Sequence, residues 1–221
     1  MLPVAGIGEK IMWGVVVLLV IGYLAGTWLN RQRSKALGQW LQEGLKALGG
    51  KPTWKWIGTM SSGAQATVSG AAKPFSQAEI TYFLLTRELL PLWGVELLRG
   101  KRDMLVIRAD LRGTPAHEIE VVPLRGALRR TLDKQAGDQP WEWQEGPAGL
   151  GLATRGSGHE RIIAATRAFL DRYGQHVQRM SLRQRKPHLI LFARLAGLEQ
   201  APAGDFLRAV GDVVGAGQPQ N

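Results

Sequence analysis

The N-terminal part of the chain carries two hydrophobic patterns, one after the other. Residues 11–30 contain no charged side chain and are rich in Val, Leu and Ile. In the following stretch apolar residues recur at spacings of three and four: Leu37, Trp40, Leu41, Leu45 and Leu48. An uncharged helix of about 20 residues spans a bilayer core, whereas the second spacing forms one face of an amphipathic helix. We therefore predict a short extracytoplasmic N-terminus (1–10), a transmembrane helix (11–30) and an amphipathic juxtamembrane helix (31–50).

Two pairs of residues within 11–30 fit a membrane anchor. Trp13 and Trp28 lie near its two ends, where the aromatic belts of membrane helices lie. Gly22 and Gly26 are four residues apart, a spacing that lets a partner helix approach closely. The alternatives are a buried core helix and a cleaved signal peptide, although the apolar region of a signal peptide is usually shorter than this one.

The charges that flank the anchor predict its orientation. Only Lys10 precedes it, whereas Arg31, Arg33 and Lys35 follow it closely. The positive-inside rule then places the C-terminal domain in the cytoplasm. The juxtamembrane helix has two alternative placements: it packs on the domain, or it lies on lipid through Trp40 and its basic flank.

The rest of the chain alternates between short β-like and longer helical patterns. Strands are expected in a hairpin over 54–72 and at 79–85, 103–111, 118–122, 177–182 and 188–195, and helices at 86–99, 125–134, 160–173 and 205–214. This order predicts an α+β cytoplasmic domain. A Gly- and Pro-containing linker or ordered loop (136–148) would divide it into two small α/β half-domains, 53–135 and 149–215, before a tail at 216–221.

Composition narrows the chemistry. The 221 residues include no cysteine, which excludes disulfides, thiol catalysis and Cys-based metal sites. The four histidines are scattered, no glycine-rich segment has P-loop spacing, and Glu118 and Glu120 fit a solvated pair on one strand face. We therefore predict a protein that is not an enzyme, with no catalytic, cofactor-binding or metal-binding residues and no cofactor.

The surplus of basic residues is the strongest remaining signal. The net charge is +10, and it belongs to the part of the chain after the anchor. Such residues can contact anionic lipid or RNA phosphates, or form a solvated face without a partner. The candidate contact residues are Arg31, Arg33, Lys35, Arg179, Arg183, Arg185 and Lys186.

The order of these features resembles the calumin family, the coiled-coil-domain protein of the endoplasmic-reticulum PAT complex at the multipass translocon. The similar segments are 30–45, 69–111, 118–134, 167–184, 188–195 and 204–214. The similarity is clearest where a Phe-Leu-x-x-Tyr helix end (169–173) leads into a short strand. The resemblance implies one membrane helix, a cytosolic α/β domain and a role in helping multipass proteins insert beside a Sec-type channel.

The chain also departs from that family. Only ten residues precede the apolar stretch, so the acidic segment to which the family's calcium binding is attributed is missing, and so is its basic C-terminal coiled coil. Calcium binding is therefore not expected. A bacterial or archaeal plasma membrane is favoured over an internal membrane.

The expected function is that of a single-pass membrane-anchored accessory or chaperone factor for insertion and folding of multipass membrane proteins at a Sec-type translocon. Its expected partners are membrane lipid, Sec-type channel or insertase subunits, nascent membrane proteins, ribosomal RNA and a helix docked on Gly22 and Gly26. The alternative is a generic membrane-tethered binding or regulatory domain with an unknown partner.

Overall fold

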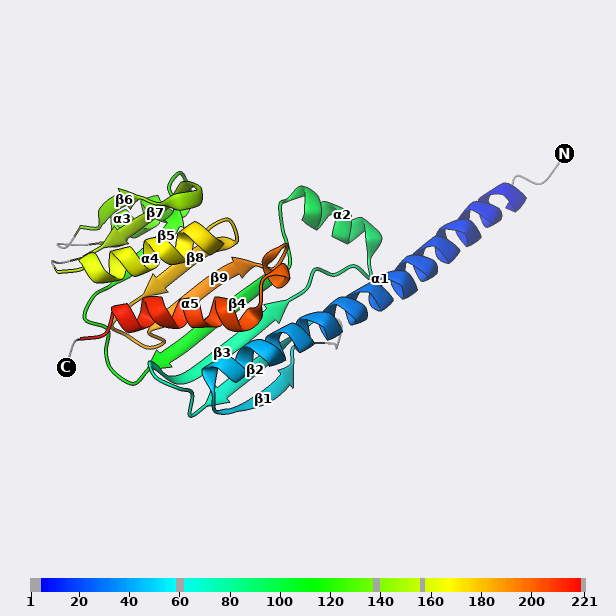
Figure 1. The fold of residues 1–221 in the computed structure, drawn as a ribbon. Helices are drawn as coiled ribbons and strands as arrows, with labels where there is room; N and C mark the ends of the chain where they lie inside the picture. The colour runs from blue at the N-terminus through cyan, green and yellow to red at the C-terminus, as the bar shows by residue number, and fades with distance from the viewer. Residues whose placement is uncertain (1–4, 59–61, 137–139, 156–157, 220–221) are drawn as a thin grey trace.

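The N-terminal region forms a single long helix that extends beyond the rest of the molecule (Figure 1). The computed structural model describes residues 5–58, 62–136, 140–155 and 158–219. Helix α1 (Ala5–Leu48) contains both predicted N-terminal helices without a break, because the residues around the junction are mostly good helix formers. It ends where Gly49 and Gly50 adopt positive φ angles of 64° and 77°. Glycine accommodates such angles without strain.

After α1, the described residues build one antiparallel sheet of nine strands. The strands are β1 (Lys51–Trp56), β2 (Gly63–Ser69), β3 (Phe75–Phe83), β4 (Met104–Leu111), β5 (Ile119–Pro123), β6 (Glu142–Glu145), β7 (Leu150–Thr154), β8 (Val177–Leu182) and β9 (Leu189–Arg194). Their spatial order is β1-β2-β3-β4-β9-β8-β5-β7-β6. The sheet thus continues across the predicted linker, and β5 lies between β7 and β8 from the later part of the chain.

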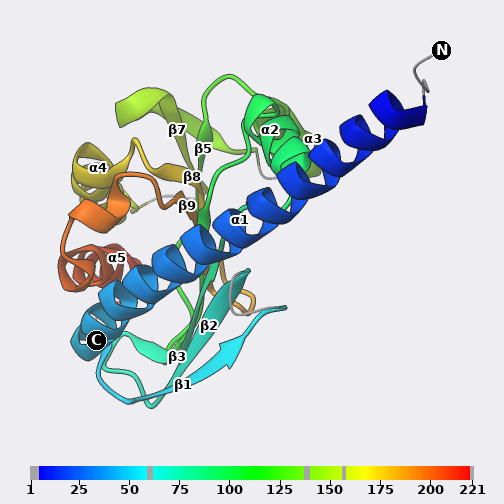
Figure 2. The ribbon, with the colours of Figure 1, turned by 90° about the vertical axis from the view of Figure 1, so that its right-hand side faces the viewer.

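Within the part of the chain that the structure describes, four further α-helices accompany the sheet: α2 (Leu90–Leu98), α3 (Ala127–Gln135), α4 (Glu160–Tyr173) and α5 (Ala203–Ala216). Two short 3-10 turns, η1 (Pro147–Gly149) and η2 (Leu198–Gln200), precede β7 and α5. The C-terminal half of α1 lies beside α5, and α5 lies beside α4, so that these three helices form a layer over the sheet (Figure 2). The predicted α+β domain is therefore confirmed.

The core lies between this helical layer and the sheet. Leu37, Leu41, Leu45 and Leu48 of α1 are all buried in the same cluster as residues of α5, such as Phe206 and Val210. Each fully buried side chain of this size contributes about 1.5–3 kcal/mol. The second half of α1 is therefore a component of the domain core, as the first of its two alternative placements predicts.

The predicted linker contains structure that the pattern did not reveal. Strand β6 lies within 136–148, and β7 follows it after the short η1 turn. All five residues of β7 are buried, so the strand lacks the alternation by which a half-buried strand is recognised. Parts of the predicted termini and linker (1–4, 137–139 and 220–221) lie outside the described residues.

Candidate functional site

The exposed half of α1 is the most distinctive surface of the molecule. Among the described residues, α1 is the one helix that is long and apolar enough to cross a membrane, and only 11% of its apolar window is buried. Trp13 and Trp28 are both exposed. A core helix would be mostly buried, so that alternative is wrong. The helix is consistent with a single membrane span or a signal sequence.

The two glycines predicted to receive a partner helix are covered by the chain's own segment. A Cβ added at Gly26 would collide with the carbonyl oxygen of Arg87, and one at Gly22 would lie 2.7 Å from Cδ1 of Leu90. The connection from β3 to α2 therefore lies directly on this side of α1. The spacing indicated a close approach, but the neighbour comes from within the molecule.

A cluster of polar residues fixes α1 to the domain at the C-terminal end of its uncharged stretch. The Asp103 carboxylate accepts a hydrogen bond from Nε of Arg33 at 2.5 Å and another from Nη2 of Arg87 at 2.8 Å. It accepts a third hydrogen bond from the backbone N–H of Leu85 at 2.9 Å. Asn30 accepts Nη1 of Arg87 at 2.6 Å and donates to the carbonyl of Leu85 at 2.9 Å. We call Asn30, Arg33, Leu85, Arg87 and Asp103 the polar clasp.

The electrostatics of the polar clasp favour its charged form. Burial raises the pKa of Asp103. The hydrogen bonds from Arg87, Leu85 and Arg33 and the charge of Arg87 together lower it by more, so its pKa lies below the usual value. Burial lowers the pKa of Arg33, whereas its bonds and charge interactions with Asp103 and Glu199 raise it above its usual value. The clasp is therefore an ionised, structural site.

The predicted basic contact residues fall into separate places. Arg31 and Lys35 are exposed on α1, whereas Arg33 turns into the polar clasp and also donates to Glu199 at 3.0 Å. Arg179 binds Glu120 through two hydrogen bonds, of 3.1 and 3.2 Å. The fork geometry of an arginine explains this bidentate pairing.

The last three predicted contacts, Arg183, Arg185 and Lys186, lie in the β8–β9 turn. Burial, followed by the neighbouring Arg185 charge, lowers the pKa of Arg183. The register places this turn at the end of the sheet away from the polar clasp, because Leu189 pairs with Ala109 whereas Arg194 pairs with Met104, next to Asp103. The five residue-to-residue steps along the strand separate the two ends by about 17 Å. The set is therefore divided between an anchor-proximal part and a distal part.

Glu120 departs from its sequence interpretation. Instead of forming a solvated pair with Glu118, it is buried at 6% exposure and accepts bonds from both Arg179 and Ser181. The expectation of a solvated pair is wrong for Glu120, because its binding residues lie on β8, which sequence alone did not place beside β5. Arg179 lies 59 residues after Glu120 in the sequence, so no local sequence pattern indicates that the two side chains pair.

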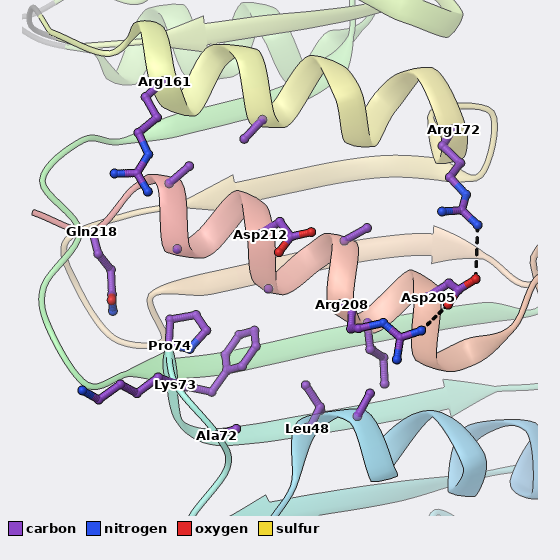
Figure 3. Close-up of a pocket in the computed structure, with 18 residues that line it drawn as sticks. Leu48, Ala72, Lys73, Pro74, Arg161, Arg172, Asp205, Arg208, Asp212 and Gln218 are labelled. Carbon is purple, nitrogen blue, oxygen red and sulfur yellow. Dashed lines mark hydrogen bonds and ion pairs between the residues drawn. The ribbon is translucent and has the colours of Figure 1, made fainter. Parts of the chain in front are cut away.

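An open groove of about 920 Å³ lies between α4, α5, the end of α1 and the β2–β3 connection (Figure 3). Asp205 binds Arg208 and also Nη2 of Arg172 at 3.3 Å, whereas Lys73 and Arg161 make no ion pair with a described residue. The groove is basic, but its lining offers no nucleophile beside a base. Its chemistry fits weak binding of an anion or an acidic surface.

Other site types find no support in the part of the chain that the structure describes. No three His, Asp or Glu side chains there lie close enough to hold a metal ion. His188 is buried and accepts the backbone N–H of Leu111 through Nδ1 at 3.0 Å. Burial lowers its pKa, so this histidine has a structural role as a neutral acceptor.

No family model matches the chain, and no curated protein matches it at a significant level. The resemblance to the calumin family therefore stays a prediction, and the function must be argued from the surfaces described above.

Proposed function

We propose that the chain is a single-pass membrane protein with a cytoplasmic domain, acting as a non-catalytic accessory or chaperone factor in the insertion and folding of multipass membrane proteins at a Sec-type translocon. The observation that carries the membrane part is the division of α1. Its apolar first half is exposed to the surroundings, whereas its second half is part of the domain core. A bilayer is the solvent that makes such a surface stable.

The placement of positive charge supports the cytoplasmic orientation. Arg31 and Lys35 lie on the domain side of the apolar half, and Arg99, Lys101 and Arg102 follow the connection that lies against α1. These residues add to the excess of basic residues on that side of the anchor, which the positive-inside rule assigns to the cytoplasm.

The domain offers surfaces for binding. The β8–β9 turn with Arg183, Arg185 and Lys186 lies away from the anchor, so it fits a cytoplasmic anionic partner such as ribosomal RNA better than the anchoring bilayer. Exposed Arg31 and Lys35 fit lipid headgroups. The separation of these basic groups supports a domain that bridges a membrane and a cytoplasmic partner.

The biogenesis role rests on the resemblance to the calumin family. The same combination of one apolar helix and an α+β domain held directly below it would bring the domain close to helices that leave a channel. The alternative remains a membrane-tethered binding or regulatory domain with an unrelated partner, since the anchor and the basic surfaces alone serve that role equally well.

The test is a crosslinking pulldown of the full chain in mild detergent, at low and at high salt. We expect channel or insertase subunits, multipass clients, and ribosomal components that are lost at high salt. The variant Arg185→Glu with Lys186→Glu should lose the ribosomal components. A matched control with the same charge change, Arg125→Glu with Arg130→Glu on and before α3, should retain them. A partner set without channel subunits and clients would overturn the biogenesis role and favour the alternative.

A further inference from the structure

The segment between β3 and β4 leaves the sheet at the end of β3 and returns to the same end of the sheet at the start of β4. Asp103, directly before β4, accepts the backbone N–H of Leu85, just after β3, through Oδ1 at 2.9 Å. Its Oδ2 accepts Nη2 of Arg87 at 2.8 Å. Residues 86–102 therefore form an excursion that is closed at its base by one buried carboxylate.

The excursion runs along the uncharged side of α1. Asn30, at the base, lies in the polar clasp. Gly26 meets the backbone of Arg87, and Gly22 meets the side chain of Leu90. At 1.5 Å per residue, these contacts lie about 6 and 12 Å from Asn30 along the helix axis. The start of α2 thus reaches well into the length of α1 that we assign to the membrane.

Helix α2 itself is largely apolar and has no buried residue. Most of its large apolar side chains, and that of the residue before it, are exposed: Leu89, Leu90, Leu92, Val95 and Leu98. Leu98 is 90% exposed. The acid of this helix, Glu96, binds Nζ of Lys101 at 3.0 Å. A helix of this composition is not stable against water on so many sides.

We propose that α2 is a second membrane-embedded element, an interfacial helix that inserts its leucines and Val95 into the cytoplasmic leaflet beside α1. This inference rests on the proposed membrane anchoring. In Figures 1 and 2, α2 lies next to α1 where α1 leaves the domain. The chain is then anchored by two elements of different depth, α1 across the bilayer and α2 in one leaflet.

Three observations select lipid as the occupant of this surface. The exposed side chains of α2 continue the exposed apolar surface of α1, so a bilayer around α1 up to Asn30 also surrounds Leu90. The excursion ends in Arg99, Lys101 and Arg102, which are exposed and placed to contact anionic headgroups. Trp93 lies in the middle of α2, and Trp is enriched at membrane interfaces.

The backbone of the excursion fits this environment. A membrane-embedded helix satisfies its own N–H and C=O groups, whereas irregular backbone requires protein around it. Of the irregular residues, Arg87 and Glu88 lie against α1, and both are partly buried, as is Thr86. The helical part carries most of the exposed apolar side chains, and the irregular residues 99–102 that follow it are mainly basic.

The absence of cysteine from the chain allows a direct test with single-cysteine variants of the full-length protein. Leu92→Cys and Leu98→Cys place an environment-sensitive NBD fluorophore on α2. Val17→Cys does so on the exposed half of α1, and Ala168→Cys on the exposed face of α4. Each protein is reconstituted in phosphatidylcholine vesicles containing phosphatidylglycerol, with and without doxyl-labelled lipids. All four positions are exposed, so the labels do not enter the core.

We expect the α2 probes to show blue-shifted emission and to be quenched most by a doxyl group near the lipid carbonyls. The Val17 probe should be quenched most by a doxyl group near the acyl-chain end, and the Ala168 probe by neither. If the α2 probes behave like Ala168 while Val17 is quenched, the anchor is correct and the inference about α2 is wrong. If Val17 is not quenched either, the proposed membrane anchoring fails as well. A blue shift of the α2 probes without lipid quenching would identify a protein contact and overturn the lipid assignment.

Discussion

The two halves of α1 belong to one uninterrupted helix but depend on different surroundings. In the first half, large side chains such as Leu18 and Ile21 are more than half exposed. In the second half, Leu37, Leu41 and Leu45 are almost completely buried against the domain. Hydrophobicity alone therefore does not predict where a helix is buried. The distribution of apolar residues around the helix does: the first half of α1 is apolar on all sides, whereas the second half is apolar on one face.

The polar clasp lies at the boundary between these halves. It makes α1 a rigid extension of the domain, because Arg33 from the helix and Arg87 from the excursion bind the same carboxylate. In the proposed membrane arrangement, a helix held in this way would fix the height of the domain relative to the bilayer. Substitutions in the clasp, in each half of α1 and at its glycines test this comparison.

The largest effect is expected from Asp103→Ala. The substitution removes the carboxylate that two partly buried guanidinium groups share, although Arg33 keeps Glu199 and Arg87 keeps Asn30. It also leaves the N–H of Leu85 without its acceptor, and the total cost should be about 4 kcal/mol in the free energy of unfolding. The measurement is urea unfolding in detergent, followed by tryptophan fluorescence. The matched control is Asp110→Ala, which removes a carboxylate that lies 3.8 Å from exposed Lys186. Loss of this long contact to an exposed lysine should cost less than about 1 kcal/mol. Equal effects of the two substitutions would show that the clasp does not hold α1.

The next effect compares the same substitution in the two halves of α1. Leu41 is 1% exposed, and Leu41→Ala should lower the free energy of unfolding by about 3 kcal/mol through lost burial and a cavity. Leu18→Ala should change domain stability by less than about 0.5 kcal/mol. A similar loss for Leu18→Ala in the same urea titration would contradict the separation of the two halves.

A smaller and graded effect is expected along the glycines of α1. Gly26→Ala forces the backbone of Arg87 away, and such overpacking should cost about 1–3 kcal/mol. At Gly22 the side chain of Leu90 can move, so the cost should be lower. Gly14 has no neighbour within 4 Å, and Gly14→Ala should be neutral or slightly stabilising. The amide hydrogen exchange of residues 86–102 should increase most in Gly26→Ala, less in a substitution of Gly22 by Ala, and least in Gly14→Ala. An increase for Gly14→Ala equal to that for Gly26→Ala would exclude the contact with the excursion.

Sequence patterns predicted most of the local elements of this molecule, with β6 and β7 as exceptions. Strand β8 and helix α4 begin and end where the periodicity places them, because amphipathic spacing and Gly174 are local signals. The helix predicted from residue 86 instead begins at Leu90, since the preceding residues lie against α1. That contact joins segments distant in the chain and leaves no trace in a local pattern.

The candidate sites show the same limit. Arg31 and Lys35 are exposed, and their contact with lipid or RNA stays a prediction, whereas Arg33 and Arg179 have partners that only the tertiary fold supplies. The glycine spacing correctly indicated a close approach to α1, but it could not distinguish another molecule from the chain's own excursion. Charge and spacing thus identify residues that can make contacts, and the fold decides which contacts they make.

The smallest effect is the pH dependence of the polar clasp. The pKa of Asp103 is lower in the folded than in the unfolded chain, so its stabilisation is complete above the unfolded value, about 3.9, and is lost as the pH falls through the folded value. One proton changes the free energy of unfolding by at most about 1.4 kcal/mol per pH unit. Urea titrations below pH 5 should therefore show a steeper loss of stability for the native chain than for Asp103→Asn, which cannot ionise. If the two chains lose stability in parallel, other carboxylates determine the acid sensitivity, and the boundary between the halves of α1 does not depend on the charge of Asp103.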